Sequence, residues 1–122
     1  MRHLDLFSGI GGFALAAKWA GFETVGFCEQ DDFCKSVLAA RWPGVPIHDD
    51  VRELDGRLFR GVELISGGYP CQPFSSSGKR LGAKDDRHLW PEMRRIIEQA
   101  RPTWVVSENV AGHITMGLDD VL

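Results

Sequence analysis

Short apolar runs alternate with helical patterns along the first half of the chain. The run at residues 4–7 stops at the glycine-rich segment 8–12, and the alanine-rich stretch 13–20 follows and ends before Gly21. Glycine permits a tight turn and ends helices, so this order predicts a strand, a turn and a helix. Residues 24–28 predict a second strand.

The second helix starts at Asp31 or Asp32, either of which can cap it, and Pro43 forbids its continuation. Its expected apolar positions are Phe33, Val37, Leu38 and Ala40. Residues 45–48 predict a short strand, and residues 62–65 predict a buried one. Between them, Val51, Leu54 and Leu58 have the spacing of a short helix.

A long loop is predicted at residues 69–87, which have no apolar period. A helix begins near Leu89 with Pro91 in its first turn, and residues 103–107 predict another strand. Residues 112–122 have the pattern of a further helix. The apolar positions of the helix after Leu89 are Met93, Ile96, Ile97 and Ala100.

Strands that alternate with helices at this spacing predict a doubly wound α/β fold with a mostly parallel sheet that stops after about the fifth strand. Ligands bind such sheets at the carboxyl ends of the strands. Polar and glycine-rich segments follow every predicted strand, so we expect them to gather along one edge. They are residues 7–12, Glu29, Asp50, residues 67–71, Glu108 and Asn109.

Length and composition fit one soluble domain, with 122 residues, 43% hydrophobic and 25% charged. The apolar runs are far shorter than the roughly 20 residues that cross a bilayer, and the N-terminus lacks the apolar region of a signal peptide. Three cysteines without metal-binding spacing indicate a reducing compartment. We therefore expect a cytoplasmic protein with no metal site and no membrane partner.

Positive charge is concentrated in one segment of a chain whose formal net charge is −3. Residues 79–101 hold 7 basic and 4 acidic residues. The cluster Lys79, Arg80, Lys84 and Arg87 suits contact with phosphates. On charge alone, a solvated loop explains it equally well.

The glycine turn and Glu29 together indicate an adenosine cofactor. Glycines let a ligand approach backbone amides at a helix N-terminus. Glu29 comes 17 residues after Gly12, at the end of the next strand, where its carboxylate can accept the ribose hydroxyls. The pattern does not separate a dinucleotide from S-adenosylmethionine (SAM), and a tight turn without any nucleotide is the alternative.

Cys71 and Glu108 follow the fourth and fifth predicted strands and form a candidate catalytic pair. A thiolate that attacks C6 of a pyrimidine puts negative charge on the ring, which a Glu at N3 would stabilise. A buried structural cysteine is the alternative, and it suits Cys28 and Cys34 better because they lie in a predicted strand and helix. A surface carboxylate is the alternative for Glu108.

Six segments in order resemble the motifs of the C5-cytosine DNA methyltransferases. They are residues 5–13, Glu29, Asp50 with Val51, residues 67–75, residues 87–89 with the helix that follows, and Glu108-Asn109-Val110. The resemblance implies a Rossmann-like SAM-dependent methyltransferase fold, SAM as cofactor, and a cytosine flipped out of duplex DNA. It also implies Cys71 as nucleophile and Glu108 as the N3 partner.

The resemblance assigns roles to further residues. Cofactor contacts fall on Phe7, Ser8, Gly9, Ile10, Gly11, Gly12, Glu29, Asp50, Val51, Pro70 and Leu89. Substrate contacts fall on Gln72, Ser75, Lys79, Arg80 and Asn109.

The family's later arginine motif, target-recognition region and last motif have no counterpart after Glu108. Residues 1–122 are therefore expected to be the N-terminal part of the catalytic domain, inactive alone, with a missing region or a second chain supplying recognition. A restriction-modification setting is the expected context. The alternatives are a tRNA cytosine methyltransferase and a non-catalytic SAM-binding regulator.

Overall fold

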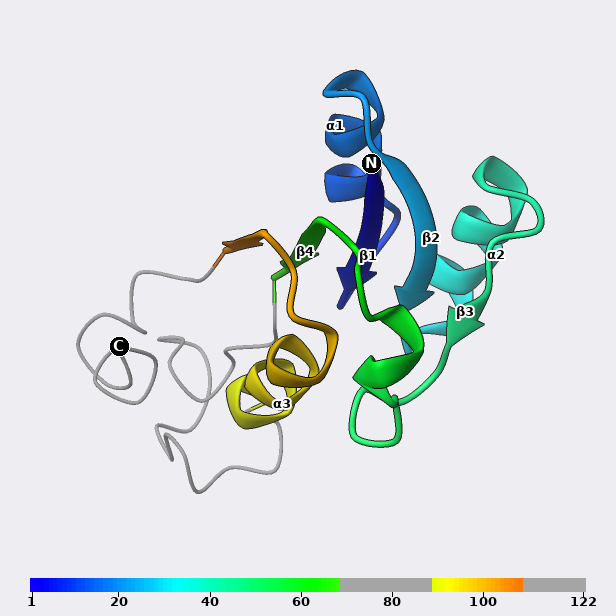
Figure 1. Cartoon of the computed structure of the whole chain (residues 1–122). Coiled ribbons are helices and arrows are strands. Elements are labelled where there is room, and N and C mark those ends of the chain that lie inside the picture. The colour runs from blue at the N-terminus through cyan, green and yellow to red at the C-terminus, as the bar shows by residue number, and fades with distance from the viewer. Residues whose placement is uncertain (69–88, 109–122) are drawn as a thin grey trace.

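A computed structural model describes residues 1–68 and 89–108 of the chain. These residues form five parallel strands, three α-helices and a short 3-10 helix (Figure 1). The strands are β1 (Arg2–Leu6), β2 (Glu23–Cys28), β3 (Ile47–His48), β4 (Leu64–Gly67) and β5 (Trp104–Ser107). The helices are α1 (Gly12–Trp19), α2 (Asp32–Arg41), the 3-10 helix η1 (Gly56–Phe59) and α3 (Trp90–Ala100).

The sheet order is β3-β2-β1-β4-β5, and every neighbouring pair is parallel. The chain moves outward from β1 to β3 and then returns to the other side of β1 to form β4. The order therefore reverses between β1 and β4, and such a switch point is where ligands bind in open α/β sheets. The predicted doubly wound parallel α/β fold is confirmed.

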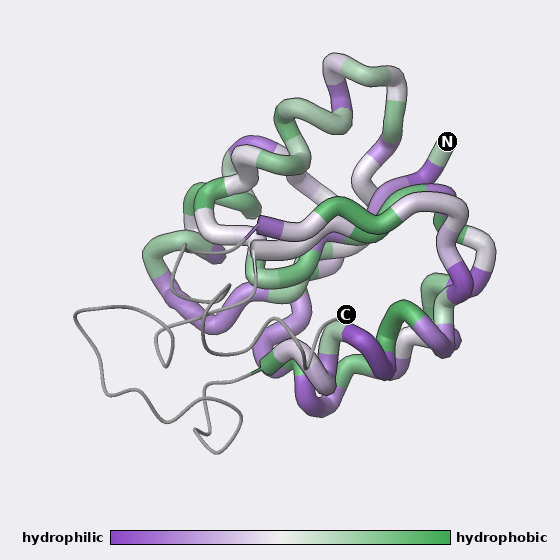
Figure 2. Tube along the Cα trace, turned by 90° about the vertical axis from the view of Figure 1, so that its left-hand side faces the viewer, coloured by the Kyte–Doolittle hydropathy of each residue, from purple (hydrophilic) through white to green (hydrophobic). Residues whose placement is uncertain are grey.

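Helices cover both faces of the sheet. On one face, α3 and η1 bury apolar side chains against Leu4, Leu6 and Ile65 of the central strands. On the other face, α1 and α2 enclose Phe27 together with Ala14 and Leu38. Figure 2 shows hydrophobic segments along the strands and mixed segments along the helices that pack on them.

Buried polar side chains cross the face of the sheet that α1 and α2 cover. His3 Nδ1 lies 2.8 Å from Thr24 Oγ1, and His3 Nε2 lies 2.6 Å from Ser66 Oγ. The same Ser66 oxygen lies 2.6 Å from Asp5 Oδ1, while Asp5 Oδ2 has no hydrogen-bond partner among the described residues. All four side chains are buried, and their contacts form a continuous polar network across β1, β2 and β4.

The second helix is capped as predicted, but part of its predicted apolar face is wrong. The Asp31 carboxylate accepts a hydrogen bond from Cys34 N at 2.9 Å, and Leu38 is fully buried. Phe33 is 70% exposed and Ala40 is also exposed. Phe33 is five positions from Leu38, and Ala40 is two. In a helix with 3.6 residues per turn, both therefore lie on the side opposite Leu38.

The short helix predicted from Val51, Leu54 and Leu58 is also wrong. The chain instead makes a turn and then the 3-10 helix η1, in which Leu58 is 71% exposed and Phe59 is buried. Gly56 lies so close to α3 that a Cβ atom there would be 2.7 Å from Ile96 O. Packing against α3 therefore sets the backbone of this segment.

The fourth strand is shifted from the predicted residues 62–65 to Leu64–Gly67, because it pairs with β1 from His3 to Leu6. Val62 remains buried beside the strand. The apolar face of α3 is confirmed, with Met93, Ile96 and Ala100 fully buried. The predicted loop 69–87 and helix 112–122 lie outside the described residues.

No helix within residues 1–68 and 89–108 is long and apolar enough to cross a membrane.

Candidate functional site

The glycine turn that follows β1 has an uncommon backbone conformation. Phe7, Gly9 and Gly11 have φ values of 53°, 56° and 96°. A left-handed conformation at Phe7 costs on the order of 1–3 kcal/mol and persists only where its surroundings impose it. Ser8 N donates to Cys28 O at 3.1 Å, and Ser8 Oγ donates to Asp5 O at 2.9 Å. The turn is therefore fixed to the ends of β1 and β2.

Backbone amides on both sides hold the Glu29 carboxylate in place. Oε1 accepts a hydrogen bond from Gly9 N at 2.7 Å, and Oε2 accepts one from Asp31 N at 2.9 Å. An ionised carboxylate has about four acceptor sites, so each oxygen keeps one for a ligand. Glu29 thus joins the glycine turn to the start of α2 while it remains able to accept two hydroxyl groups.

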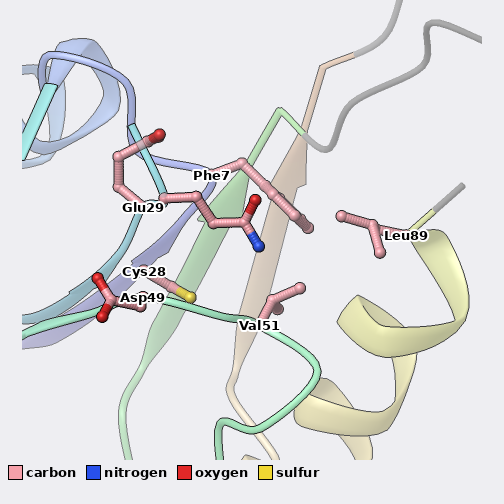
Figure 3. A pocket seen from close by; sticks show the side chains of 7 residues that line it. Phe7, Cys28, Glu29, Asp49, Val51 and Leu89 are labelled. Carbon is pink, nitrogen blue, oxygen red and sulfur yellow. The ribbon is translucent and has the colours of Figure 1, made fainter. Parts of the chain in front are cut away.

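A pocket opens at the carboxyl ends of β1, β2 and β3 (Figure 3). Its lining residues are Phe7, Cys28, Glu29, Gln30, Asp49, Val51 and Leu89. Three of them, Phe7, Val51 and Leu89, bring apolar side chains from three separate segments around the space (Figure 3). Apolar walls with a few fixed polar groups are typical of small-molecule sites.

The N-terminus of α1 lies beside this pocket and has no side-chain cap. Its N-cap residue is Gly11, and no acidic side chain occupies its first turn. Among the described residues, a Cβ atom added at Gly9 or Gly12 would meet no atom within 4 Å. Within this part of the chain the turn therefore leaves open space next to the first amides of α1, which suits the anionic end of a ligand.

The pocket brings together four residues predicted to contact a cofactor: Phe7, Glu29, Val51 and Leu89. Asp50 is not among its lining residues. The Asp50 carboxylate instead accepts hydrogen bonds from Arg52 N and Nε at 2.9 Å and 3.1 Å, which lower its pKa.

Sequence reasoning missed three lining residues, Cys28, Gln30 and Asp49. Cys28 and Gln30 flank Glu29 directly, so their position at a strand end is a signal that pointed to them. Asp49 had no such signal, since the sequence does not show which of two adjacent aspartates faces the pocket. Asp49 also forms an ion pair with Lys35 of α2.

The other predicted residues of the turn have different surroundings. Ser8 is 7% exposed and its hydroxyl is bonded to main-chain oxygens, so it stabilises the turn. Ile10 is 51% exposed at the tip of the turn. Gly11 is packed against α2, whereas Gly12 is open.

Glu108, one member of the candidate catalytic pair, lies beside the end of β4. Glu108 N donates a hydrogen bond to Gly67 O at 3.2 Å. A Cβ atom added at Gly68 would lie 3.8 Å from the Cβ atom of Glu108. Its side chain is exposed. Cys71 follows Gly68 by three residues in the sequence but lies outside the described part of the chain.

Six other predicted contact residues also lie outside the described ranges. They are Pro70, Gln72, Ser75, Lys79, Arg80 and Asn109.

The two described cysteines have environments that disfavour a thiolate. Burial, then the charges of Asp50 and Glu29, raise the pKa of Cys28 to about 12. Desolvation and the neighbouring Asp31 raise the pKa of Cys34. A neutral thiol is a poor nucleophile, so the structure is consistent with structural roles for both.

Comparisons with known proteins agree on one family. The sequence model of the C-5 cytosine-specific DNA methylases matches residues 1–119. Type II methyltransferase M.PspPI of Psychrobacter sp. is 42% identical over 112 residues, which are 89% of this chain and 27% of that protein. Type II methyltransferase M.NgoMIV of Neisseria gonorrhoeae is 38% identical over 110 residues, 89% of this chain and 35% of that protein.

Solved structures show the same fold. A DNA modification methyltransferase encoded within an E. coli prophage has a TM-score of 0.78 and 30% identity, and the match covers 93% of this chain and 33% of that one. The S. pombe Dnmt2 methyltransferase, at 22% identity, has a TM-score of 0.77 over 98% of this chain and 39% of that one. The chain thus spans about a third of the relatives that it matches.

Proposed function

Because the chain belongs to the C-5 cytosine-specific DNA methylase family, we propose that it is the SAM-binding and nucleophile-bearing part of a DNA (cytosine-5)-methyltransferase. The observation that carries the proposal is the pocket that joins Phe7, Glu29, Val51 and Leu89 beside the glycine turn. The family implies SAM, and these residues fit it: a fixed carboxylate, apolar walls and open helix amides meet at one edge of the sheet.

Each part of the pocket would have a role toward SAM. Glu29 would accept hydrogen bonds from the ribose hydroxyls, Phe7, Val51 and Leu89 would pack on the adenine, and the amides at the start of α1 would hold the carboxylate of the methionine portion. When bound, SAM supplies the methyl group.

The chain's own residues prepare the cytosine. The Cys71 thiolate forms a bond to C6, and the electron pair of the C5–C6 double bond moves into the ring, where Glu108 at N3 stabilises the charge. After methylation the C5 proton leaves, its electron pair restores the double bond, and the S–C6 bond breaks. Gln72, Ser75 and Asn109 contact the flipped base, while Lys79 and Arg80 contact phosphates.

The names of the relatives support DNA rather than tRNA as the substrate. M.PspPI and M.NgoMIV are type II methyltransferases, and the prophage protein is a DNA modification methyltransferase. A restriction-modification setting fits these names.

The 122 residues alone are expected to transfer no methyl group to DNA. Flipping a base costs a few kcal/mol, and the chain spans only 35% and 27% of the relatives M.NgoMIV and M.PspPI, so we expect the region that offsets that cost to belong to the rest of such a protein. The expected DNA affinity of the 122 residues is weak, non-specific and reduced by salt, because it depends on the basic segment 79–101.

Incorporation of tritium from labelled SAM into unmethylated DNA tests this directly. The chain combined with the remaining region of a full-length family member, in one chain or as two, is expected to label the C5 position of cytosine, and DNA already methylated at the target is the control. Labelling by the 122 residues alone contradicts the division of labour. No labelling by the combined protein contradicts the proposed function.

A further inference from the structure

The three glycines of the turn have different surroundings. Gly9 and Gly12 have no close neighbour in the described parts of the chain, but a Cβ atom at Gly11 would lie 2.5 Å and 2.7 Å from Cζ3 and Cη2 of Trp42. The six-membered ring of Trp42 therefore lies directly against the Gly11 backbone. Gly11 also has a φ of 96° and is the N-cap of α1, so this contact falls where the turn becomes a helix.

Trp42 is itself held in place by the core beneath α2. Its backbone N donates to Leu38 O at 2.8 Å as the C-cap of the helix. Its ring makes an edge-to-face contact with the fully buried Phe27, with ring centroids 5.3 Å apart. Leu38 also reaches the turn, with Cδ2 3.2 Å from a Cβ atom at Gly11.

We propose that Trp42 is a positioning residue that holds the glycine turn in its SAM-binding conformation. This inference rests on the proposed function. In this conformation Gly9 N donates a hydrogen bond to the Glu29 carboxylate, and the Phe7 side chain lines the pocket. Without the Trp42 ring the turn populates other conformations, and the apparent affinity falls in proportion to the fraction that remains competent.

Trp42→Leu is expected to weaken SAM binding by the full chain about tenfold, measured by calorimetric titration. Trp19→Leu is the matched control, because Trp19 is 78% exposed and lies at the far end of α1, and it is expected to change affinity less than twofold. Equal affinities of the two variants overturn the proposal.

Glu29→Ala separates this inference from the proposed function. If Glu29→Ala weakens binding and Trp42→Leu does not, only the role of Trp42 is wrong. If the unaltered chain binds no SAM, both are wrong.

A double variant tests the contact itself. Gly11→Ala is expected to weaken SAM binding, since the added methyl group meets the Trp42 ring and a φ of 96° strains alanine; the second cost is the same in both backgrounds. In the Trp42→Leu background the same change should cost several-fold less, because the obstructing ring is gone. If the fold-reduction in SAM affinity of the double variant equals the product of the two single reductions, the result contradicts a contact through Gly11.

A measurement without a core substitution covers the case in which Trp42→Leu fails to fold. Incorporated 5-fluorotryptophan gives one ¹⁹F resonance for each of the 4 tryptophans. Addition of SAM is expected to shift the Trp42 resonance and to leave the Trp19 resonance in place, with Phe substitutions of Trp19, Trp90 and Trp104 assigning the Trp42 resonance by elimination. A stationary Trp42 resonance at saturating SAM overturns the proposal.

Discussion

Cys71→Ser is expected to abolish the covalent complex that the complete enzyme forms with duplex DNA carrying 5-fluorocytosine at the target position. Fluorine replaces the C5 proton and cannot leave as a cation, so the S–C6 bond of the normal enzyme persists after methylation. The serine hydroxyl stays protonated at neutral pH and is a much weaker nucleophile than a thiolate, so no such bond forms. The readout is a protein band that moves with the DNA on a denaturing gel.

Cys28→Ala and Cys34→Ala are the comparison variants, and neither is expected to abolish the complex, although Cys28 also lines the cofactor pocket. Cys28 is 2% exposed in β2, where its pKa of about 12 keeps the thiol protonated, and Cys34 lies in α2. Mass spectrometry of the digested complex identifies the modified residue. A cytosine bound to any residue other than Cys71 contradicts the proposed chemistry.

Single substitutions of His3 and Asp5 are expected to change the pH dependence of unfolding in opposite directions. Burial lowers the pKa of His3 from 6.5 to about 4 and raises that of Asp5 from 3.8 to about 7, with the Ser66 and Ser8 hydroxyls opposing the second shift and the Glu29 charge adding to it. Between pH 4 and 6.5 the folded pair holds one proton on Asp5, and the unfolded pair holds one on His3. Their contributions therefore cancel.

Asp5→Asn leaves His3 alone with a lowered pKa. The unfolded chain then binds the extra proton, so the free energy of unfolding rises with pH from about 4 to 6.5, by up to about 1.4 kcal/mol per pH unit relative to the unaltered chain. His3→Gln leaves Asp5 alone with a raised pKa. Stability present below pH 3.8 is then lost as the pH rises through about 7.

Urea denaturation at several pH values between 4 and 7 measures these slopes. The double variant, which has neither titrating group, is the control and is expected to run parallel to the unaltered chain. Parallel curves for all four proteins contradict the account of a proton held by Asp5 in the folded state.

Local signals in the sequence account for the parts of the fold that were predicted. A strand, a glycine turn and a helix follow one another at the site. The Asp31 carboxylate caps α2 by accepting a hydrogen bond from the backbone N of Cys34, three residues further along the chain. Glu29 could be placed beside the turn because parallel strands end at one edge of the sheet. Such features depend on residues close in sequence or on the topology alone.

Features that the sequence did not predict depend on contacts between distant segments. Trp42 lies 31 positions from Gly11, and neither residue alone indicates that they touch. Pairing with β1 decided the bounds of β4, and α3 decided the path around Gly56. Which of Asp49 and Asp50 faces the pocket likewise depends on how the chain turns after β3.

The central claim is that the glycine turn and Glu29 form a SAM site, and calorimetric titration of SAM into the chain and its Glu29→Ala variant tests it most directly. The unaltered chain is expected to bind SAM weakly, because residues 1–122 supply one wall of the site. Loss of hydrogen bonds to a charged group should weaken binding by about 10- to 100-fold in Glu29→Ala, while Glu98→Ala, which removes an exposed carboxylate of α3, leaves it unchanged. Equal affinities of the unaltered chain and Glu29→Ala would contradict the assignment of the site.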